Sequence, residues 1–593
     1  MAKSSWSETS KKESVKKTGT SYNTDVENKL LSKAKDRFRL AQSAKVDHDG
    51  ESYHKKWKRY DQIYRGEQWF GTISPDKSTP VLNFTQSLVH SLVPRLTENE
   101  PETMLMPRMS PSDFELAQSL MGVTKHLWYI NRMQEEQLGE GVLQALKYGT
   151  VLFKTFWDPE MWDGLGDVRH TVVHPMNFFP DPRAHNIRNM EYCFVRTAKP
   201  LEYFERRWGN KGEYVVRDND WVEIEALKGR DHDSTEPQAT LSEYWFKDSN
   251  GNVCVMYYAG DVVLAILGGE FDKMVEFKKR PLYLHNRFPF AVVYDYKVDK
   301  QFWGIGEVEL CETLQNLINA YEAQIVDNTR LMGNAQWIVN KVLSGLDETD
   351  AWVFDNQPGR VIFTHNDGVR REPGLPIPYH IPDHLEKLIF WMEQITGVYD
   401  IMQGRRPVGV RAASAIIALQ EAASIRVRQK AKELAAGIRE MVEQSIWIVL
   451  ENYTEPRMVR LAGDMLPTTL DVRQALEERV VDMAKAADLL PPEAYAEGGE
   501  PQVPPEMMEE LMQEVKFPEF DVHVAVGPSV PYSQALLYEQ SKEFYQLGII
   551  DRQAVLEATN FPQREVILKR MAEAAAGMVA EESEEERIGE KTF

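Results

Sequence analysis

The chain has 593 residues, which is too long for one hydrophobic core and suggests about three or four structural units. Its 42% hydrophobic content excludes a wholly disordered protein, and its net charge of −22 argues against a simple duplex-DNA binder, because lysine and arginine make most phosphate contacts. Three cysteines are too few for a disulfide framework and favour a reducing cytosol, and no apolar run approaches the roughly 20 residues that cross a bilayer.

The first half of the chain is predicted to be helical and then rich in strands. Residues 1–28 contain Ser, Thr and Lys without an apolar core, which predicts a disordered tail and no signal peptide. Apolar spacing predicts helix over most of 114–149, with Gly149 as its C-cap. From 150 to 300, Val, Tyr, Phe and Trp with frequent turns predict strands. These include a hairpin at Asn250-Gly251 and a strand over 290–296.

Two helices are predicted around a small module in the middle of the chain. The first covers 307–332, and its apolar stripe recurs at helical spacing. A compact insertion punctuated by Gly and Pro follows at 337–381, with a strand predicted at 359–365. The second helix covers 383–395. This order predicts a helical hairpin with a knob at its tip.

A much longer helix is predicted after a break at Gly397. It runs from about Ala412 to Tyr453, and about 40 residues at 1.5 Å each would span roughly 60 Å. A helix of that length either bridges domains or packs against neighbouring subunits. Beyond it lie an acidic, Pro-rich insertion at 485–515, a strand at 521–526 and further helices after residue 533.

Positive charge is concentrated where this long helix begins. Residues 404–432 contain seven basic side chains and one acid in an otherwise acidic chain. Arg405, Arg406 and Arg411 fall in a Gly- and Pro-containing loop, which makes them candidates for phosphate contact; alternatively they pair with acids of a neighbouring subunit. The basic residues of 426–432 form two i,i+4 ridges, as expected of a solvated or subunit-contacting helix.

Motifs for catalysis are missing from the sequence. It contains no G-x-x-x-x-G-K-[ST], H-E-x-x-H, G-x-S-x-G or C-x-x-C, so no ATP motor or hydrolase is predicted. The strongest metal-like group comprises His170, His174, Asp181 and His185. The first two would lie on one strand face but about 13 Å apart, too far to share an ion, so a strand followed by an Asp-Pro turn is favoured. The triplet 47–49 is a weaker group.

Six stretches follow one another in a distinctive order over residues 50–580. They are YRGEQW before VLNFTQSLVHSLVPRL; LKYGTVLFKTFWDP; VVHPMNFFPDPRAHNIRNMEYCFVRT; FWGIGEVELCETLQNLINAYEAQIVDN; ITGVYDIMQG; and VAVGPSVPYSQALLYEQSKEFYQLGIIDRQAVLEATNFP. In this order the sequence resembles the portal proteins of tailed double-stranded DNA bacteriophages, the rings through which DNA enters and leaves the capsid.

The resemblance implies a helix-rich α+β fold with wing, stem, clip and crown, assembled as a dodecameric ring with a central channel. The implied parts are a tail (1–28), wing (29–304), first stem helix (305–336), clip (337–381), second stem helix (382–397), tunnel loop (398–411), long wing helix (412–456), wing return with the 485–515 insertion (457–530), crown helices (531–578) and acidic tail (579–593).

The resemblance also implies site residues and partners. Arg405, Arg406 and Arg411 would contact DNA without sequence specificity. An acidic stem lining would repel phosphates so that DNA slides, and its candidates are Glu309, Glu312, Glu322, Asp327, Glu386 and Glu393. Expected partners are the terminase large subunit, the major capsid and scaffolding proteins, and a head–tail adaptor, with no membrane, cofactor, metal or catalysis. The expected location is the host cytoplasm during assembly and then one virion vertex.

Two other functions remain open from the sequence. One is another ring-forming head–tail adaptor, although adaptors are usually smaller. The other is a metal-dependent nuclease that uses the Asp/His group at 170–185.

Overall fold

The computed structural model is an α+β structure. It describes residues 23–71, 77–108, 113–218, 237–271, 281–333, 337–345, 368–371, 377–397, 425–453, 457–459, 468–470, 473–474, 477–481, 519–525, 541–551, 555–556 and 567. The chain divides into two compact units. Unit 1 comprises 1–59, 173–288 and 298–302, unit 2 comprises the rest, and helix α2 (Tyr53–Arg65) contains the first boundary.

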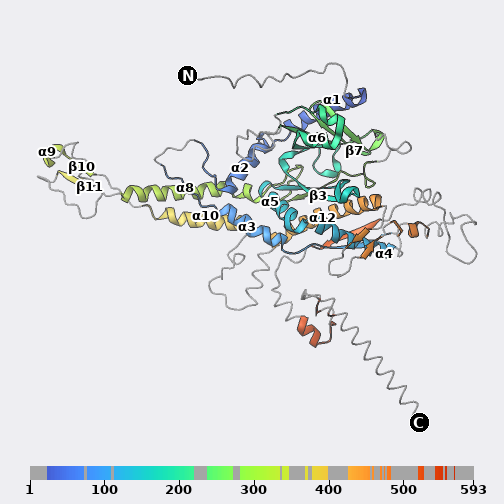
Figure 1. Cartoon of the computed structure of the whole chain (residues 1–593). Helices are drawn as coiled ribbons and strands as arrows, with labels where there is room; N and C mark the ends of the chain where they lie inside the picture. The colour runs from blue at the N-terminus through green and yellow to red at the C-terminus, as the bar shows by residue number, and fades with distance from the viewer. Residues whose placement is uncertain are drawn as a thin grey trace, which may run out of the picture. The chain divides into compact units, whose positions relative to one another are not determined.

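Unit 1 is built on a five-stranded antiparallel sheet (Figure 1). Its strands, in spatial order, are β4 (Phe178–Pro180), β5 (Tyr192–Pro200), β6 (Gln238–Lys247), β7 (Val253–Ala259) and β8 (Val262–Leu267). Short 3-10 turns lie at Pro175–Asn177, Ile187–Asn189, Gly209–Tyr214 and Gly269–Phe271. The predicted hairpin at Asn250-Gly251 is confirmed, since Gly251 adopts φ +83° in the β6–β7 turn.

The two faces of this sheet have separate hydrophobic cores. Helix α1 (Asp25–Ser43) supplies Leu31, Ala34 and Ala41 to a cluster rich in strand aromatics. Helix α6 (Leu201–Trp208) supplies Phe204 to the other cluster. Thr24 and Glu27 form a reciprocal capping box, which explains why α1 begins inside the predicted tail 1–28.

A buried lysine fastens the α1–α2 connection of unit 1 to the segment before β4. Lys45 is 3% exposed, and its Nζ donates to three carbonyl oxygens, of Pro175 (2.7 Å), Met176 (3.0 Å) and Phe178 (2.8 Å). The rings of Trp57 and Phe179 lie 4.9 and 4.4 Å from the same Nζ. Burial lowers the pKa of Lys45 well below its usual value, while the three acceptors satisfy the ammonium donors.

Unit 2 places helices around a three-stranded sheet of order β3-β2-β9. The sheet strands are β2 (Thr150–Asp158), β3 (Asp167–Val173) and β9 (Phe290–Tyr294). The helices are α3 (Phe84–Thr97), α4 (Phe114–Ile130), α5 (Leu138–Tyr148), α8 (Glu307–Gly333), α9 (Lys341–Ser344), α10 (His380–Thr396) and α12 (Ile425–Asn452), with a π-helix at Met133–Gln137 and a 3-10 turn at Met161–Gly164. Three two-stranded ribbons pair β1 (Glu102–Pro107) with β14 (Phe520–Ala525), β10 (Trp337–Val339) with β11 (Val369–Arg371), and β12 (Arg457–Val459) with β13 (Thr468–Leu470).

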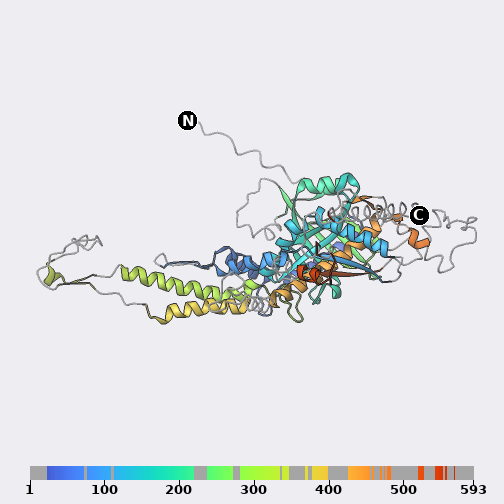
Figure 2. The same ribbon diagram turned by 90° about the horizontal axis from the view of Figure 1, so that it is seen from below.

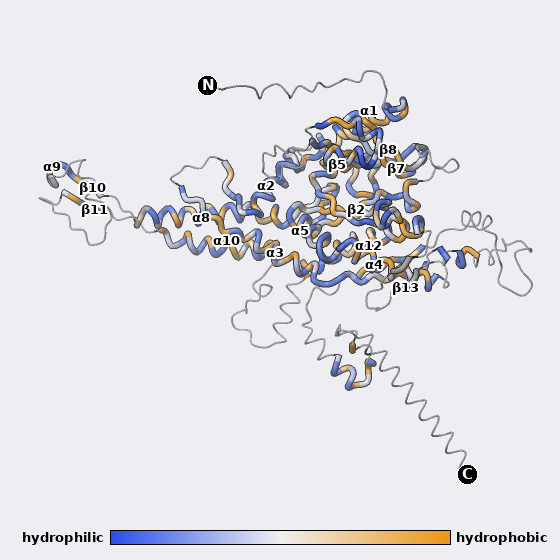
Figure 3. The backbone as a smooth tube through the Cα atoms, viewed as in Figure 1, coloured by the Kyte–Doolittle hydropathy of each residue, from blue (hydrophilic) through white to orange (hydrophobic). Residues whose placement is uncertain are grey.

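Helix α12 packs directly on the sheet of unit 2. Its contacts include β9, β2 and β14, and the residues it buries are largely apolar. Hydrophobic residues recur along the helix in Figure 3. At Gly437 the helix and β9 approach so closely that a Cβ would meet Val293 Cγ2 at 2.2 Å. The described part of the predicted 412–453 helix is therefore a core element of this unit, while 412–424 lie outside the described residues.

Helices α8 and α10 form the predicted hairpin. They lie side by side in both views, with α9, β10 and β11 beyond the end of α8 (Figures 1 and 2). Helix α10 begins at His380, three residues before the predicted start, because Pro382 falls in the first turn, where a helix tolerates proline. Gly397 ends it in the left-handed conformation, φ +73°. The strand predicted at 359–365 lies outside the described residues.

Other local predictions are confirmed. Gly149 ends α5 with φ +81°, β9 covers most of the predicted strand 290–296, and β14 matches the strand predicted at 521–526. None of the described helices has the length and apolar character needed to cross a membrane.

The carbonyl cage of Lys45 gives a stability prediction. Lys45→Met removes the donor from three buried carbonyl groups, so we expect the free energy of unfolding of unit 1 to fall by about 2–4 kcal/mol. Lys29→Met, at an exposed position of α1, is the control and should change it little. Urea denaturation followed by circular dichroism measures both, and equal midpoints for the two variants would contradict the role of the cage.

Candidate functional site at the joint of α8, α10 and α12

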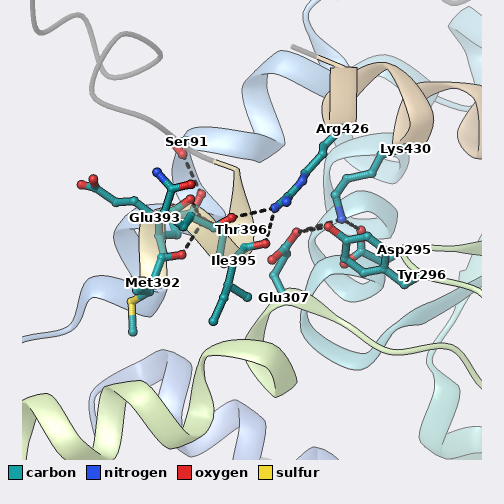
Figure 4. Close-up of polar contacts among 12 residues, drawn as sticks. Ser91, Asp295, Tyr296, Glu307, Met392, Glu393, Ile395, Thr396, Arg426 and Lys430 are labelled. Atoms are coloured by element: carbon teal, nitrogen blue, oxygen red, sulfur yellow. Dashed lines mark hydrogen bonds and ion pairs between the residues drawn. The ribbon is translucent and has the colours of Figure 1, made fainter. Parts of the chain in front are cut away.

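The first two turns of α12 insert their basic ridge into unit 2. Arg426 and Lys430, at i and i+4, reach toward the end of α10 and the start of α8, respectively (Figure 4). The prediction that residues 426–432 form a solvated or subunit-contacting ridge is therefore wrong for Lys430, which is 5% exposed inside its own chain. Lys432 on the second ridge is exposed.

Lys430 joins three elements of unit 2. Its Nζ forms ion pairs with Asp295, which directly follows β9, and with Glu307 Oε1 (2.9 Å), the first residue of α8. The same Nζ lies 3.7 Å from the ring centroid of Tyr296, whose hydroxyl donates to Glu307 Oε1 (3.1 Å). We call these four residues the Lys430 cluster. All its charged members are at least 90% buried, so the cluster depends on mutual pairing.

Burial and neighbouring charges act differently on the pKa of Lys430 and on the pKa of Asp295. Burial lowers the pKa of Lys430, but the carboxylates of Asp295 and Glu307 outweigh it and raise that pKa above its ordinary value. For Asp295, burial outweighs the attraction of Lys430, and with the nearby charge of Glu307 it raises the pKa from 3.8 to about 7. Lys430 is thus firmly protonated, whereas Asp295 titrates close to neutral pH.

Arg426 ties α12 to the C-terminus of α10. Its Nη1 donates to the carbonyl oxygens of Gln394 (2.9 Å) and Ile395, two of the groups that a helix leaves unpaired at its end. The positive charge also faces the negative end of the α10 dipole. A Cβ on Gly397 would lie 2.8 Å from Arg426 Cδ, so the glycine leaves room for this contact. The C-cap of α10 and the first turn of α12 therefore lie next to each other.

His170, His174 and Asp181 of the predicted metal group each have a separate structural contact. His170 is 5% exposed; its Nδ1 is 3.2 Å from Thr155 Oγ1, and burial lowers its pKa to about 4. His174 lies beyond the end of β3, where its Nδ1 accepts from the Met176 amide (3.2 Å), so the prediction of one strand carrying both histidines is wrong. Asp181 accepts from the Arg183 amide (3.1 Å), which confirms the predicted turn.

Among the described residues, potential ligand atoms gather at Asp47, His48 and Asp49. His48 and Asp49 are exposed, and Asp47 already pairs with Lys56 at 3.2 Å. Such a group is an ordinary surface turn.

Comparison with protein families adds the decisive observation. Residues 43–590 match the family model described as phage P22-like portal protein. That match covers both units and more than nine-tenths of the chain. The chain belongs to the P22-like portal protein family. This is a structural and non-enzymatic family. The comparison with curated proteins gave no match.

Only some of the residues predicted to line a channel belong to the described part of the chain. Arg405, Arg406 and Arg411 lie outside the described residues. Of the acidic lining candidates, Glu386 on α10 is exposed. The remaining ones are half-buried, namely Glu309, Glu312, Glu322, Asp327 and Glu393.

A polar ladder on α8 of this portal protein was not predicted from the sequence. Asp327 accepts from the Ser78 amide (3.0 Å), and Asn319 accepts from the Leu82 amide (3.1 Å). Gln315, fully buried one turn earlier, accepts from the Thr85 amide at 3.1 Å. The i,i+4 spacing of Gln315 and Asn319 was a usable signal, but their partners are more than 200 residues away.

The Lys430 cluster predicts a large effect of a single truncation. Lys430→Met leaves two buried carboxylates without their cation, and we expect the free energy of unfolding to fall by about 3–5 kcal/mol. Lys432→Met, two residues away and exposed, is the matched control and should lie within about 0.5 kcal/mol of the wild type. Chemical denaturation monitored by circular dichroism distinguishes the two, and similar stabilities would exclude a structural role for the cluster.

Proposed function

We propose that this protein is the portal subunit of a tailed phage, and that its ring forms the channel at one capsid vertex. Genomic DNA would be packaged through this channel, later leave through it, and the ring would connect head to tail. The single observation that supports this most strongly is the family match over residues 43–590. The α8–α10 hairpin with strands and a short helix at its tip agrees with a stem that bears a clip.

We assign the parts of the portal to the chain accordingly. Residues 305–336 and 382–397 form the stem, and 337–381 form the clip. The tunnel loop covers 398–411, and 412–456 form the long wing helix. The remaining assignments are the wing (29–304 and 457–530) and the crown (531–578).

The partners follow from this assignment. The sequence contains no phosphate-binding loop, so a separate terminase ATPase would drive packaging and dock on the clip. A head–tail adaptor would later use the same end. The major capsid protein and the scaffolding protein would contact the wing and crown.

An apolar face on the stem supports assembly with copies of the same chain. On α10, Leu388 and Met392 are buried, but Phe390, Trp391 and Ile395 are 55%, 45% and 42% exposed. Large exposed apolar residues grouped on one helix mark a surface that another protein covers. In a closed ring every copy offers the same face to its neighbour, and we propose that the neighbouring stem covers it.

The stem face predicts the effect of two substitutions on assembly. The wild type should form a closed ring of about twelve chains, the number typical of portal proteins, whereas Phe390→Asp with Trp391→Asp should shift the protein to monomers, because two charges would be buried at each contact. Gln324→Asp, at an exposed polar position of α8, is the control. Native mass spectrometry measures the mass of the particle that each variant forms. Intact rings from the double variant would refute the assigned contact, and a wild type without rings in solution or in particles would refute the portal assignment.

The tunnel-loop arginines predict a defect in DNA handling. If Arg405, Arg406 and Arg411 contact DNA phosphates, the triple Ala variant should form rings of normal thermal stability but package or retain less DNA. If they pair with acids of a neighbouring subunit, the ring should lose stability first. Packaging of full-length genome at the wild-type rate by a stable variant ring would rule out DNA contact.

A further inference from the structure

The charges buried in the Lys430 cluster do not balance. One ammonium faces two carboxyl groups, those of Asp295 and Glu307. Asp295 Oδ2 and Glu307 Oε2 are buried, and within the described residues neither has a hydrogen-bond partner. With both groups ionised, two buried carboxylates share one ammonium, so the cluster keeps a net charge of one negative unit.

The groups that face Asp295 come from each element packed around it. They are Lys430 from α12, Glu307 from α8 and Tyr296 from its own segment. Cys311 lies beside Glu307 on α8, and Glu433 of α12 acts on the neighbouring Tyr294. In the part of the chain that is described, Lys430 is the cation that forms an ion pair with Asp295. With one proton on Asp295, the cluster contains one positive charge, on Lys430, and one negative charge, on Glu307.

We propose that the Lys430 cluster is a proton-operated joint, which holds α8 and α12 firmly when Asp295 is protonated and more loosely when both carboxyl groups are ionised. Protonation converts Asp295 from a second anion to a neutral acid whose hydroxyl can donate a hydrogen bond. Ionisation restores the net negative charge at the point where β9, α8 and α12 meet. This inference concerns the fold of the chain and does not depend on the proposed function.

The sign of the pH dependence follows from the direction of the shift. Burial and Glu307 raise the pKa of Asp295 to about 7, against 3.8 for an ordinary aspartate. Between these values the folded protein binds a proton that the unfolded chain has lost, so stability falls as the pH rises through this window and levels off above it. From pH 6 to pH 8 this group alone raises the unfolding constant about tenfold.

The position of the Lys430 cluster determines which helices lose stability when Asp295 is ionised. Lys430 lies one turn beyond Arg426, which ties α12 to the carbonyls of Gln394 and Ile395. Glu307 is the first residue of α8. Ionisation of Asp295 should therefore weaken the first turns of α8 and α12 and leave the five-stranded sheet of unit 1 unaffected.

Hydrogen exchange with mass spectrometry on the full-length protein tests the proposal. After correction for intrinsic exchange rates, peptides covering 307–312 and 425–434 should exchange about tenfold faster at pH 8 than at pH 6 in the wild type. Asp295→Asn, which keeps an uncharged acceptor for Lys430, should abolish this difference. Asp299→Asn, the same substitution at an exposed position four residues later, should retain it.

Two results would overturn the proposal. One is wild-type exchange at these peptides that is independent of pH between 6 and 8. The other is an Asp295→Asn variant with the wild-type pH dependence. If that variant does not fold, Glu307→Gln decides: removing the second charge should move the transition midpoint to a lower pH, and an unchanged midpoint would likewise refute the joint.

Discussion

The buried ammonium group of Lys430 connects three elements of unit 2, the larger of the two units. Lys430 pairs with Asp295 after β9 and with Glu307 at the start of α8, and it projects from α12, the helix that packs on the central sheet. The hairpin of α8 and α10 therefore has its base attached at two points, by Lys430 to α8 and by Arg426 to α10. Both contacts connect the hairpin to α12, which packs on the central sheet.

This arrangement changes the meaning of the positive charge at the start of α12. In an acidic chain a cluster of seven basic residues suggests contact with nucleic acid. Two of these seven basic residues are not free for nucleic acid in the structure, since Arg426 and Lys430 bind carbonyl and carboxylate groups of their own chain. Arg405, Arg406 and Arg411 lie outside the described residues, and their contact with DNA stays a prediction.

Local features of the fold were predictable because their causes are local. Apolar periodicity located α8, and Gly149 and Asn250-Gly251 were identified from their backbone requirements. The burial of Lys430 was not predictable, because a helix with charges on two ridges does not show which ridge faces inward, and its partner Asp295 is 135 residues away. The same limit applies to Gln315 and Asn319, whose partners Thr85 and Leu82 lie at and just before the start of α3 and are set by tertiary packing. The order of sequence stretches, in contrast, was sufficient to indicate the family, which the match over 43–590 confirms.

A cryo-electron microscopy reconstruction of the purified, assembled protein tests the account most directly. It should show a closed ring around an open channel, with α8 and α10 of each copy forming the wall of its narrow part. Lys430 should contact Asp295 and Glu307 of the same subunit, and Phe390 and Trp391 should lie against the neighbouring one. An open or helical assembly without a channel, or a Lys430 that pairs across the subunit boundary, would contradict the account.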